Sequence, residues 1–357
     1  SGGVLIKYRY QENPEKPETE KEWGKIELKN LSMKYRDRLQ AMMDLNGNIS
    51  YDADNIRLDN IVGRYGDSPL HLEGEINRRN ISAPEFSLRL NLPELLQTDL
   101  KDIPVFSDFK FSGPAHISIN ISGTPEDFKF QQQADLTRTG YEIPNLIKKN
   151  ENAINQLWAK GRLSGKGGLN IEDWSYELGV NKITGSMQIP DLNIPDFKVE
   201  LASEEFRTFP SHIFSDSWTA NGSLNFKISG DGNLDQIEDS RFSGEMDLIN
   251  LKIRPEKISS EWLLNAKLRF KENRFDIRSA SIVSANSKVD ISGVYKRGDS
   301  PNLELILTGE KFDIDELLPE SQEEDAKVID FLVSKDFFQK GNGQILFDVG
   351  QLNFKML

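Results

Sequence analysis

Closely spaced glycines can cradle a phosphate, and three glycine-rich strings in this 357-residue chain have that spacing. They are Gly165-Lys-Gly-Gly168, Gly230-Asp-Gly232 and Gly341-Asn-Gly343. Each string borders an alternating strand pattern, and no helical pattern follows it that could present its N-terminus to a phosphate. We therefore interpret all three strings as turns.

Carboxylates and histidines are the other candidates for acid–base or metal chemistry. Adjacent acids such as Glu204-Glu205 are expected on a solvated surface, because the chain holds 57 Asp and Glu residues. The histidines lie far apart and have no ligand spacing: His71, His116 and His212. The absence of cysteine excludes disulfides, thiolate metal sites and cysteine nucleophiles. We predict that the protein is not an enzyme, with no catalytic residue, no metal site and no cofactor.

Charge and composition exclude further classes. The net charge of −13 argues against a nucleic-acid partner, which requires a basic surface. No apolar run is long enough to span a membrane as a helix. Residues 11–22 have the composition of a disordered segment. The strand-like patterns at both ends of the chain lead us to expect a piece of a longer protein.

The dominant pattern that must position any site is an alternation of apolar and polar residues with period two. Such segments indicate half-buried strands, and the turn residues between them indicate antiparallel meanders. The alternating segments are 26–31, 56–58, 70–72, 86–90, 117–121, 174–178, 197–201, 224–228, 268–270, 275–277, 289–291 and 303–305. Turns are predicted at Asn46-Gly47-Asn48, Tyr65-Gly66-Asp67, Glu272-Asn273 and Arg297-Gly298-Asp299.

Internal repetition is a second pattern. A glycine that ends one strand recurs about every 110 residues, at Gly74, Gly185 and Gly293, each time followed by a strand that opens with proline. We predict a partial N-terminal repeat region at 4–112, repeats at 113–221 and 222–340, and the start of a further repeat at 341–357. A row of separate β-sandwich domains is the alternative, although no linker rich in Pro, Ser or Gly divides the repeats.

Helical patterns are few. Residues 145–158 are one candidate, with Ile147, Ile154 and Trp158 near one face. Residues 321–338 are a better one, because Ser321 and Glu324 fit a capping box and an apolar stripe follows. We expect this second helix to close the end of a sheet, because its polar face is acidic and therefore unsuited to a membrane surface.

Two strings carry a resemblance to a known family. Gly222-Ser-Leu-Asn-Phe-Lys-Ile-Ser-Gly230 is followed by the alternating segment 242–251, and Asn286-Ser-Lys-Val-Asp-Ile-Ser-Gly293 leads to 312–318. Together they resemble the carboxy-terminal region of the AsmA-like family of Gram-negative envelope proteins, over residues 45–357. The resemblance implies a periplasmic β-rich body, an inner-membrane helix outside this segment, and a role in outer-membrane lipid homeostasis. Larger members are thought to carry phospholipid along a β-groove.

We therefore expect a mostly β fold: repeated antiparallel strands in one elongated, curled sheet with an apolar inner groove and few short helices. The expected function is the binding and transfer of phospholipid or another acyl lipid between the inner and outer membranes. Envelope proteins are further expected partners. A scaffold of closed sandwiches that binds envelope proteins, with no lipid conduit, is the alternative. The residues predicted to line the groove are Phe86, Leu88, Leu90, Ile117, Ile119, Ile121, Phe197, Val199, Leu201, Leu224, Phe226, Ile228, Val289, Ile291, Leu303, Leu305 and Leu307.

Overall fold

The structure, a computed structural model, confirms a mostly β protein. It describes residues 3–11, 21–34, 40–100, 110–143, 147–165, 167–207, 218–255, 261–298, 300–313 and 342–353. Within these ranges the chain forms strands β1 to β22 and one short helix, α1 (Gln97–Leu100). Nineteen strands are assigned to one sheet, and β7, β10 and β11 form a second sheet of three strands.

Two compact units divide the chain. Unit 1 comprises Ser1–Pro144, Lys148–Gly179 and Ser186–Asp196, and unit 2 comprises Asn145–Ile147, Val180–Gly185 and Phe197–Leu357. Strand β14 (Asn181–Ile189) is shared between them.

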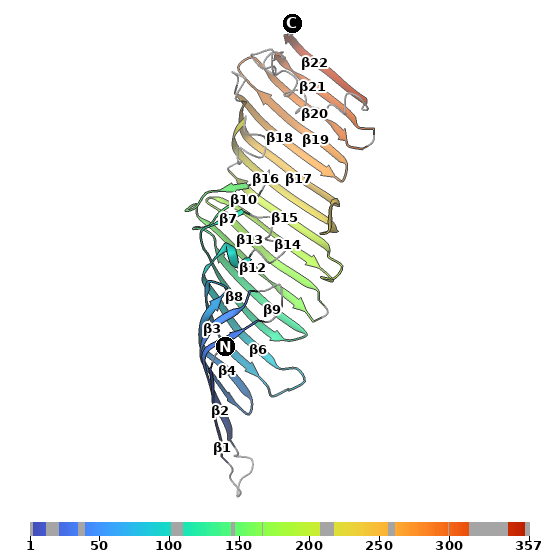
Figure 1. Ribbon diagram of the computed structural model, residues 1–357. Helices are drawn as coiled ribbons and strands as arrows, with labels where there is room; N and C mark the ends of the chain where they lie inside the picture. The colour runs from blue at the N-terminus through green and yellow to red at the C-terminus, as the bar shows by residue number, and fades with distance from the viewer. Residues whose placement is uncertain are drawn as a thin grey trace. The chain divides into compact units, whose positions relative to one another are not determined.

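Unit 1 is an antiparallel meander in which strands close in sequence pair in space (Figure 1). Its paired strands follow the order β1, β2, β3, β4, β5, β6, β8, β9, β12 and β13. Their bounds are β1 (Gly3–Gln11), β2 (Lys21–Met33), β3 (Met42–Asp52), β4 (Asn55–Tyr65), β5 (Ser68–Asn77), β6 (Glu85–Leu95), β8 (Ala115–Thr124), β9 (Asp127–Asp135), β12 (Asn155–Ser164) and β13 (Leu169–Leu178). The small sheet consists of β7 (Lys110–Ser112), β10 (Gly140–Ile143) and β11 (Ile147–Lys149).

Unit 2 continues the same local pattern with one exception. Its strands are β15 (Asp196–Phe206), β16 (Trp218–Asn233), β17 (Gln236–Pro255), β18 (Trp262–Lys271), β19 (Arg274–Val283), β20 (Lys288–Lys296), β21 (Asn302–Asp313) and β22 (Asn342–Asn353). Strands β16 to β21 pair antiparallel, each with the next. Strand β22 pairs parallel with β21, which the expected antiparallel arrangement did not include.

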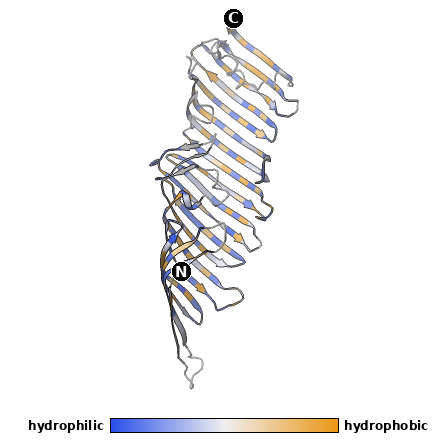
Figure 2. Ribbon diagram, in the orientation of Figure 1, coloured by the Kyte–Doolittle hydropathy of each residue, from blue (hydrophilic) through white to orange (hydrophobic). Residues whose placement is uncertain are grey.

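Alternation of side chains gives each strand one apolar and one polar face, and Figure 2 shows it as bands of opposite hydropathy along the strands. In β6, for example, Phe86, Leu88 and Leu90 are half-buried, whereas Ser87 and Arg89 between them are exposed. The same alternation of half-buried and exposed residues recurs in β9 and β21. The period-two pattern therefore identifies the strands correctly.

The alternation is not strict, because many strands contain one extra residue. Leu28 and Leu31 of β2 pack in the same apolar cluster although they are three positions apart, as do Leu58 and Ile61 of β4. At both places the strand pairing shifts by one residue, as at a β-bulge. The segment 26–31, expected to alternate throughout, therefore changes phase after Leu28.

Asparagine occupies these bulges in the left-handed conformation. The φ angles are 52° at Asn30, 46° at Asn60 and 50° at Asn250. Asparagine tolerates this conformation better than most residues because its short side chain can form local hydrogen bonds. In unit 2 the residue after Asn250, Leu251, is only 1% exposed, so the bulge returns a large aliphatic side chain to the apolar face.

Two of the expected local structures are wrong. Residues 145–158 contain β11 and the start of β12 among the described residues, because Leu157 and Ala159 alternate onto the apolar face and pair with β9. The turn expected at Asn46-Gly47-Asn48 lies inside β3. Gly47 has a φ of 150°, and a Cβ there would lie 2.8 Å from the backbone of Ile61, so this glycine permits close strand approach.

Other expectations on turns and helices have different outcomes. The turns at Gly66-Asp67 and Glu272-Asn273 are present as predicted. The helix predicted at 321–338 lies outside the described residues, as do residues 12–20 of the segment expected to be disordered. The ends of that segment, Gln11 and Lys21-Glu22, belong to strands β1 and β2.

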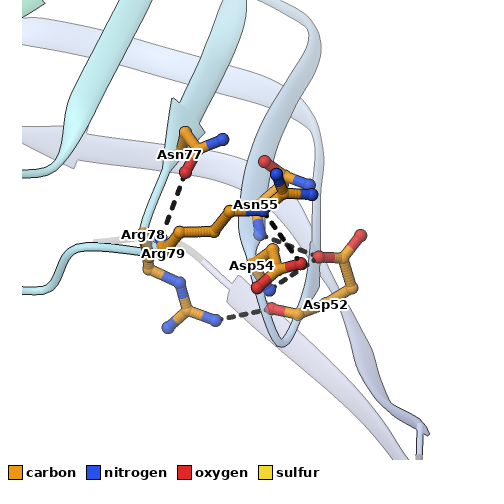
Figure 3. Close-up of polar contacts among 6 residues, drawn as sticks. All are labelled: Asp52, Asp54, Asn55, Asn77, Arg78 and Arg79. Atoms are coloured by element: carbon orange, nitrogen blue, oxygen red, sulfur yellow. Dashed lines mark hydrogen bonds and ion pairs between the residues drawn. The ribbon is translucent and has the colours of Figure 1, made fainter. Parts of the chain in front are cut away.

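The hairpin end between β3 and β4 illustrates how loops are fixed (Figure 3). The carboxylate of Asp52 accepts hydrogen bonds from the backbone N–H groups of Asp54 and Asn55 at 2.9 and 2.8 Å. Arg78, just after β5, donates to the backbone carbonyl of Asp52 at 2.6 Å, and Arg79 pairs with Asp54 at 3.3 Å. Burial alone would raise the pKa of Asp52, but the two N–H groups and the charge of Arg57 together lower it.

Candidate lipid-binding face

The predicted residues of unit 1 lie together on the apolar faces of β6 and β8. Leu88 is directly opposite Ile121, and Leu90 is directly opposite Ile119. The face continues onto β5, where Leu72 is opposite Leu90. All six predicted residues are half-buried: Phe86, Leu88, Leu90, Ile117, Ile119 and Ile121. Directly opposite side chains on neighbouring strands are close enough to pack, so these residues form one continuous aliphatic surface.

The predicted residues of β15 and β16 lie on the apolar face of unit 2. Leu224 is opposite Leu248 and Phe226 is opposite Met246 on β17. Leu224 and Leu251 form a core cluster against which Phe206 of β15 packs. The remaining predicted residues on these strands are Phe197, Val199, Leu201 and Ile228, of which Phe197 and Val199 are buried and Leu201 and Ile228 half-buried.

The predicted residues of β20 and β21 form a second aliphatic surface in unit 2. Ile291 is opposite Leu307, and Gly293 is opposite Leu305. Val289, Leu307 and Phe312 form its buried cluster, and Val349 of β22 packs against that cluster. Ile291, Leu303 and Leu305 are half-buried.

Burial divides the predicted residues into two kinds. Five are at most 9% exposed and therefore serve as core: Phe197, Val199, Leu224, Val289 and Leu307. The others keep part of their surface accessible. In unit 1 the buried cluster instead uses residues that were not predicted, such as Leu45, Ile61 and Leu70, beside the bulges of β2 and β4. The half-buried residues form the part of the apolar face that a ligand could contact.

The opposite face of each unit is polar and carries exposed ion pairs. Arg89 pairs with Glu73 at 3.6 Å across β5 and β6, and Lys288 pairs with Glu310 at 3.3 Å across β20 and β21. Exposed pairs of this kind each contribute less than about 1 kcal/mol. His71 and His116 are exposed, as expected for outward positions. Two pockets of about 550 and 390 Å³ open on this polar face, one in each unit.

A buried polar cluster at one end of the apolar face of unit 1 was not anticipated. Asn155 is fully buried, accepts a hydrogen bond from the Tyr141 hydroxyl at 3.0 Å, and donates to the carbonyl of Glu177 at 2.7 Å. The Tyr141 hydroxyl is also hydrogen-bonded to that of Tyr176, and burial raises the pKa of both phenols. Tyr141 belongs to the small sheet, so this cluster attaches that sheet to β12 and β13.

Lys149 fixes the same region from the other side. Its ammonium group donates to the carbonyls of Thr137, Thr139 and Asn150 at 3.2, 2.5 and 3.1 Å, and it lies 5.8 Å from the ring centre of Tyr141. The side chain is only 4% exposed. Alternation alone could not reveal this lysine, because it belongs to a three-residue strand whose partners are backbone carbonyls.

The described residues include no group of acidic or histidine side chains that could hold a metal ion. None of their helices is long and apolar enough to cross a membrane. Comparisons of the chain with protein-family models, curated proteins and solved structures find no match.

Proposed function

We propose that the chain is the periplasmic segment of an AsmA-like lipid-transfer protein and that the half-buried apolar face binds lipid acyl chains. The observation that carries the proposal is the partial exposure of an aliphatic surface extending over paired strands, as at Leu90 and Ile119. Each CH₂ group of an acyl chain that leaves water for such a surface gains about 0.8 kcal/mol. Binding of this kind depends on contact area and needs no reactive side chain.

The chemistry of the two faces supports the same proposal. The apolar face of β6 and β8 presents Phe, Leu and Ile side chains without a charged residue, whereas the opposite face carries the ion pairs. A lipid could slide along an aliphatic surface because no strong polar contact would hold it at one position. Curling of the sheet around the acyl chains into a groove belongs to this proposal, as does delivery of phospholipid between the inner and outer membranes.

Native mass spectrometry of the purified chain tests whether it binds lipid. We expect adducts with the masses of phospholipids, released by organic extraction and identified by their fragment ions. A chain that carries no lipid after purification, and takes up none from fluorescent phospholipid vesicles, would contradict the proposal. It would favour the scaffold alternative, in which the apolar face is covered by other parts of an envelope assembly.

Charged substitutions on the face distinguish a ligand-contacting surface from a closed core. Ile119→Asp and Phe226→Asp should abolish lipid binding and leave the melting temperature nearly unchanged, because a carboxylate on an open face remains hydrated. The matched controls are Asn120→Asp and Ser229→Asp, on exposed positions of the polar face of the same strands. A melting temperature that collapses in the two apolar-face variants alone would indicate a closed core, since burial of an unpaired charge costs several kcal/mol.

A further inference from the structure

A pocket of about 390 Å³ opens on the polar face of unit 1, opposite the proposed lipid-binding face. Four strands contribute to it, and their register places the polar side chains in two rows. The first row is His116, Asp135, Gln156 and Glu177. The second row is Ser118, Gln133, Trp158 and Ser175. The volume lies within the range of small-molecule sites, about 300–1,000 Å³.

Trp158 is the aromatic side chain of this pocket. It lies on an otherwise polar face, where it is half-buried, between Gln133 of β9 and Ser175 of β13. The ammonium group of Lys160, two residues further along β12, lies 5.6 Å from the ring centre of Trp158 and 3.8 Å from Asp173. Trp158 lines the pocket, whereas Lys160 is not among its lining residues.

The polar groups of the pocket are suited to hydroxyl groups. The side-chain amides of Gln133 and Gln156 have no hydrogen-bond partner among the residues that the structure describes. Each side-chain amide offers both a donor and an acceptor. His116 is held by Asn91, whose side-chain oxygen lies 2.8 Å from Nε2. The Asp135 carboxylate accepts a hydrogen bond from the backbone N–H of Thr137 at 2.9 Å. The hydroxyl and the backbone N–H of Thr137 together lower the pKa of Asp135, so its carboxylate stays ionised and can accept hydrogen bonds.

We infer that this pocket binds a saccharide. A sugar ring has an apolar C–H face, which can stack on the indole of Trp158, and a rim of hydroxyl groups, which can pair with the amides of Gln133 and Gln156. A phosphate ligand fits poorly, because the pocket contains the carboxylates of Asp135 and Glu177, and its described lining includes neither lysine nor arginine. An acyl chain fits poorly because most of the lining is polar.

The inference concerns the face opposite the proposed lipid-binding face and is independent of lipid transfer. Its test is saturation-transfer NMR of the whole chain with glucose, N-acetylglucosamine, maltose, cellobiose and chitobiose at millimolar concentration. At least one of these sugars should receive magnetisation through its ring protons. Gln133→Ala should raise the dissociation constant about tenfold, which corresponds to about 1.4 kcal/mol, because the sugar loses its hydrogen bonds to this side chain. Trp158→Ala should abolish the signal.

Gln131→Ala is the matched control, because Gln131 is an exposed glutamine on the same face of the same strand outside the pocket. Its affinity should equal that of the unchanged chain. The circular dichroism spectrum of each variant establishes that it is folded. The inference is overturned if no sugar of the panel binds, or if folded Gln133→Ala and Gln131→Ala variants bind with the same affinity as the unchanged chain.

Discussion

The backbone N–H of Asn250 donates a 2.7 Å hydrogen bond to the side-chain oxygen of Asn265 on the next strand. Asn250 is the left-handed residue of the β17 bulge, and its amide therefore points away from the regular ladder. Two further left-handed residues donate their N–H to an asparagine side chain. The N–H of Glu205, with a φ of 54°, donates to Asn225 at 2.7 Å, and that of Asn30 donates to Asn46 at 3.1 Å. An asparagine on the neighbouring strand thus supports the bulge in both units.

Replacement of the supporting asparagine should weaken the bulge. We expect Asn265→Ala to lower the free energy of unfolding by about 1 kcal/mol, because the Asn250 N–H loses its partner. Denaturant unfolding measures the loss, and hydrogen exchange at Asn250 should become faster. Asn120→Ala, at an exposed position of β8, is the control and should change neither quantity. Equal stability of the two variants would mean that water replaces the asparagine without cost.

Gly293 should not tolerate a side chain. Its φ is 157°, and a Cβ would lie 2.1 Å from the carbonyl oxygen of Glu304, so Gly293→Ala combines backbone strain with a collision against β21. Gly298 has a φ of 159° but no atom within 4 Å of the added Cβ, so Gly298→Ala reports the backbone strain alone. We expect the first variant to lose more stability in thermal melts, by about 1–3 kcal/mol. Similar losses would exclude the collision as a cause.

Loss of the buried lysine should destabilise the attachment of the small sheet. Lys149→Met keeps the apolar stem but leaves the carbonyls of Thr137 and Thr139 without their donor. Each buried carbonyl left without a partner should lower the free energy of unfolding by about 1–3 kcal/mol. Limited proteolysis should then cut near residues 137–150 before the rest of unit 1. Lys129→Met, on the exposed face of β9, is the control and should retain the original cleavage pattern. An unchanged pattern in Lys149→Met would contradict a structural role for the ammonium group.

Acid should weaken the hairpin end that Asp52 supports. The folded state lowers the pKa of Asp52 below its ordinary value of 3.8, so the carboxylate contributes stability above that value and loses the contribution as the pH falls through the folded-state pKa. Asp52→Asn should therefore be less stable than the unchanged chain at pH 7, with a difference that shrinks below about pH 4. Urea unfolding at both pH values measures it. A difference that stays constant with pH would rule out the charge of Asp52 as its origin.

Period-two alternation predicted the strands of this protein because each strand has one wet and one apolar face. Phe86, Leu88 and Leu90 are an example that needs no tertiary information. Alternation did not predict the bulges, because one extra residue simply places two polar residues in succession, as at Lys29 and Asn30. The spacing of three between Leu28 and Leu31 was the available signal, and it recurs between Leu58 and Ile61. The parallel pairing of β22 could not be predicted, because alternation is the same for both strand directions.

The repeat predicts that its glycines occupy equivalent places, and the strand register allows this comparison for Gly74 and Gly293. Gly74 and Gly293 occupy equivalent places: each has a φ near 150° and pairs with the residue that precedes the bulge of the strand before it, Leu58 or Ile277. Gly185 lies on β14, also among half-buried residues of the apolar pattern. The polar pocket around Trp158 was missed, because its side chains come from four strands and only the register brings them together.

The bulges also restrict how such a chain could evolve by recombination. In β17 the apolar side chains occupy even-numbered positions up to Leu248 and odd-numbered positions from Leu251 onward. A crossover at a hairpin turn exchanges whole strands and keeps both halves in phase. A crossover within a strand could instead join a strand that has the extra residue to one that lacks it. If the new strand lost the extra residue at Asn250, the aliphatic side chains of one half would point into water. Exchange by whole hairpins is therefore the route by which the length of this sheet could change without loss of its two-faced character.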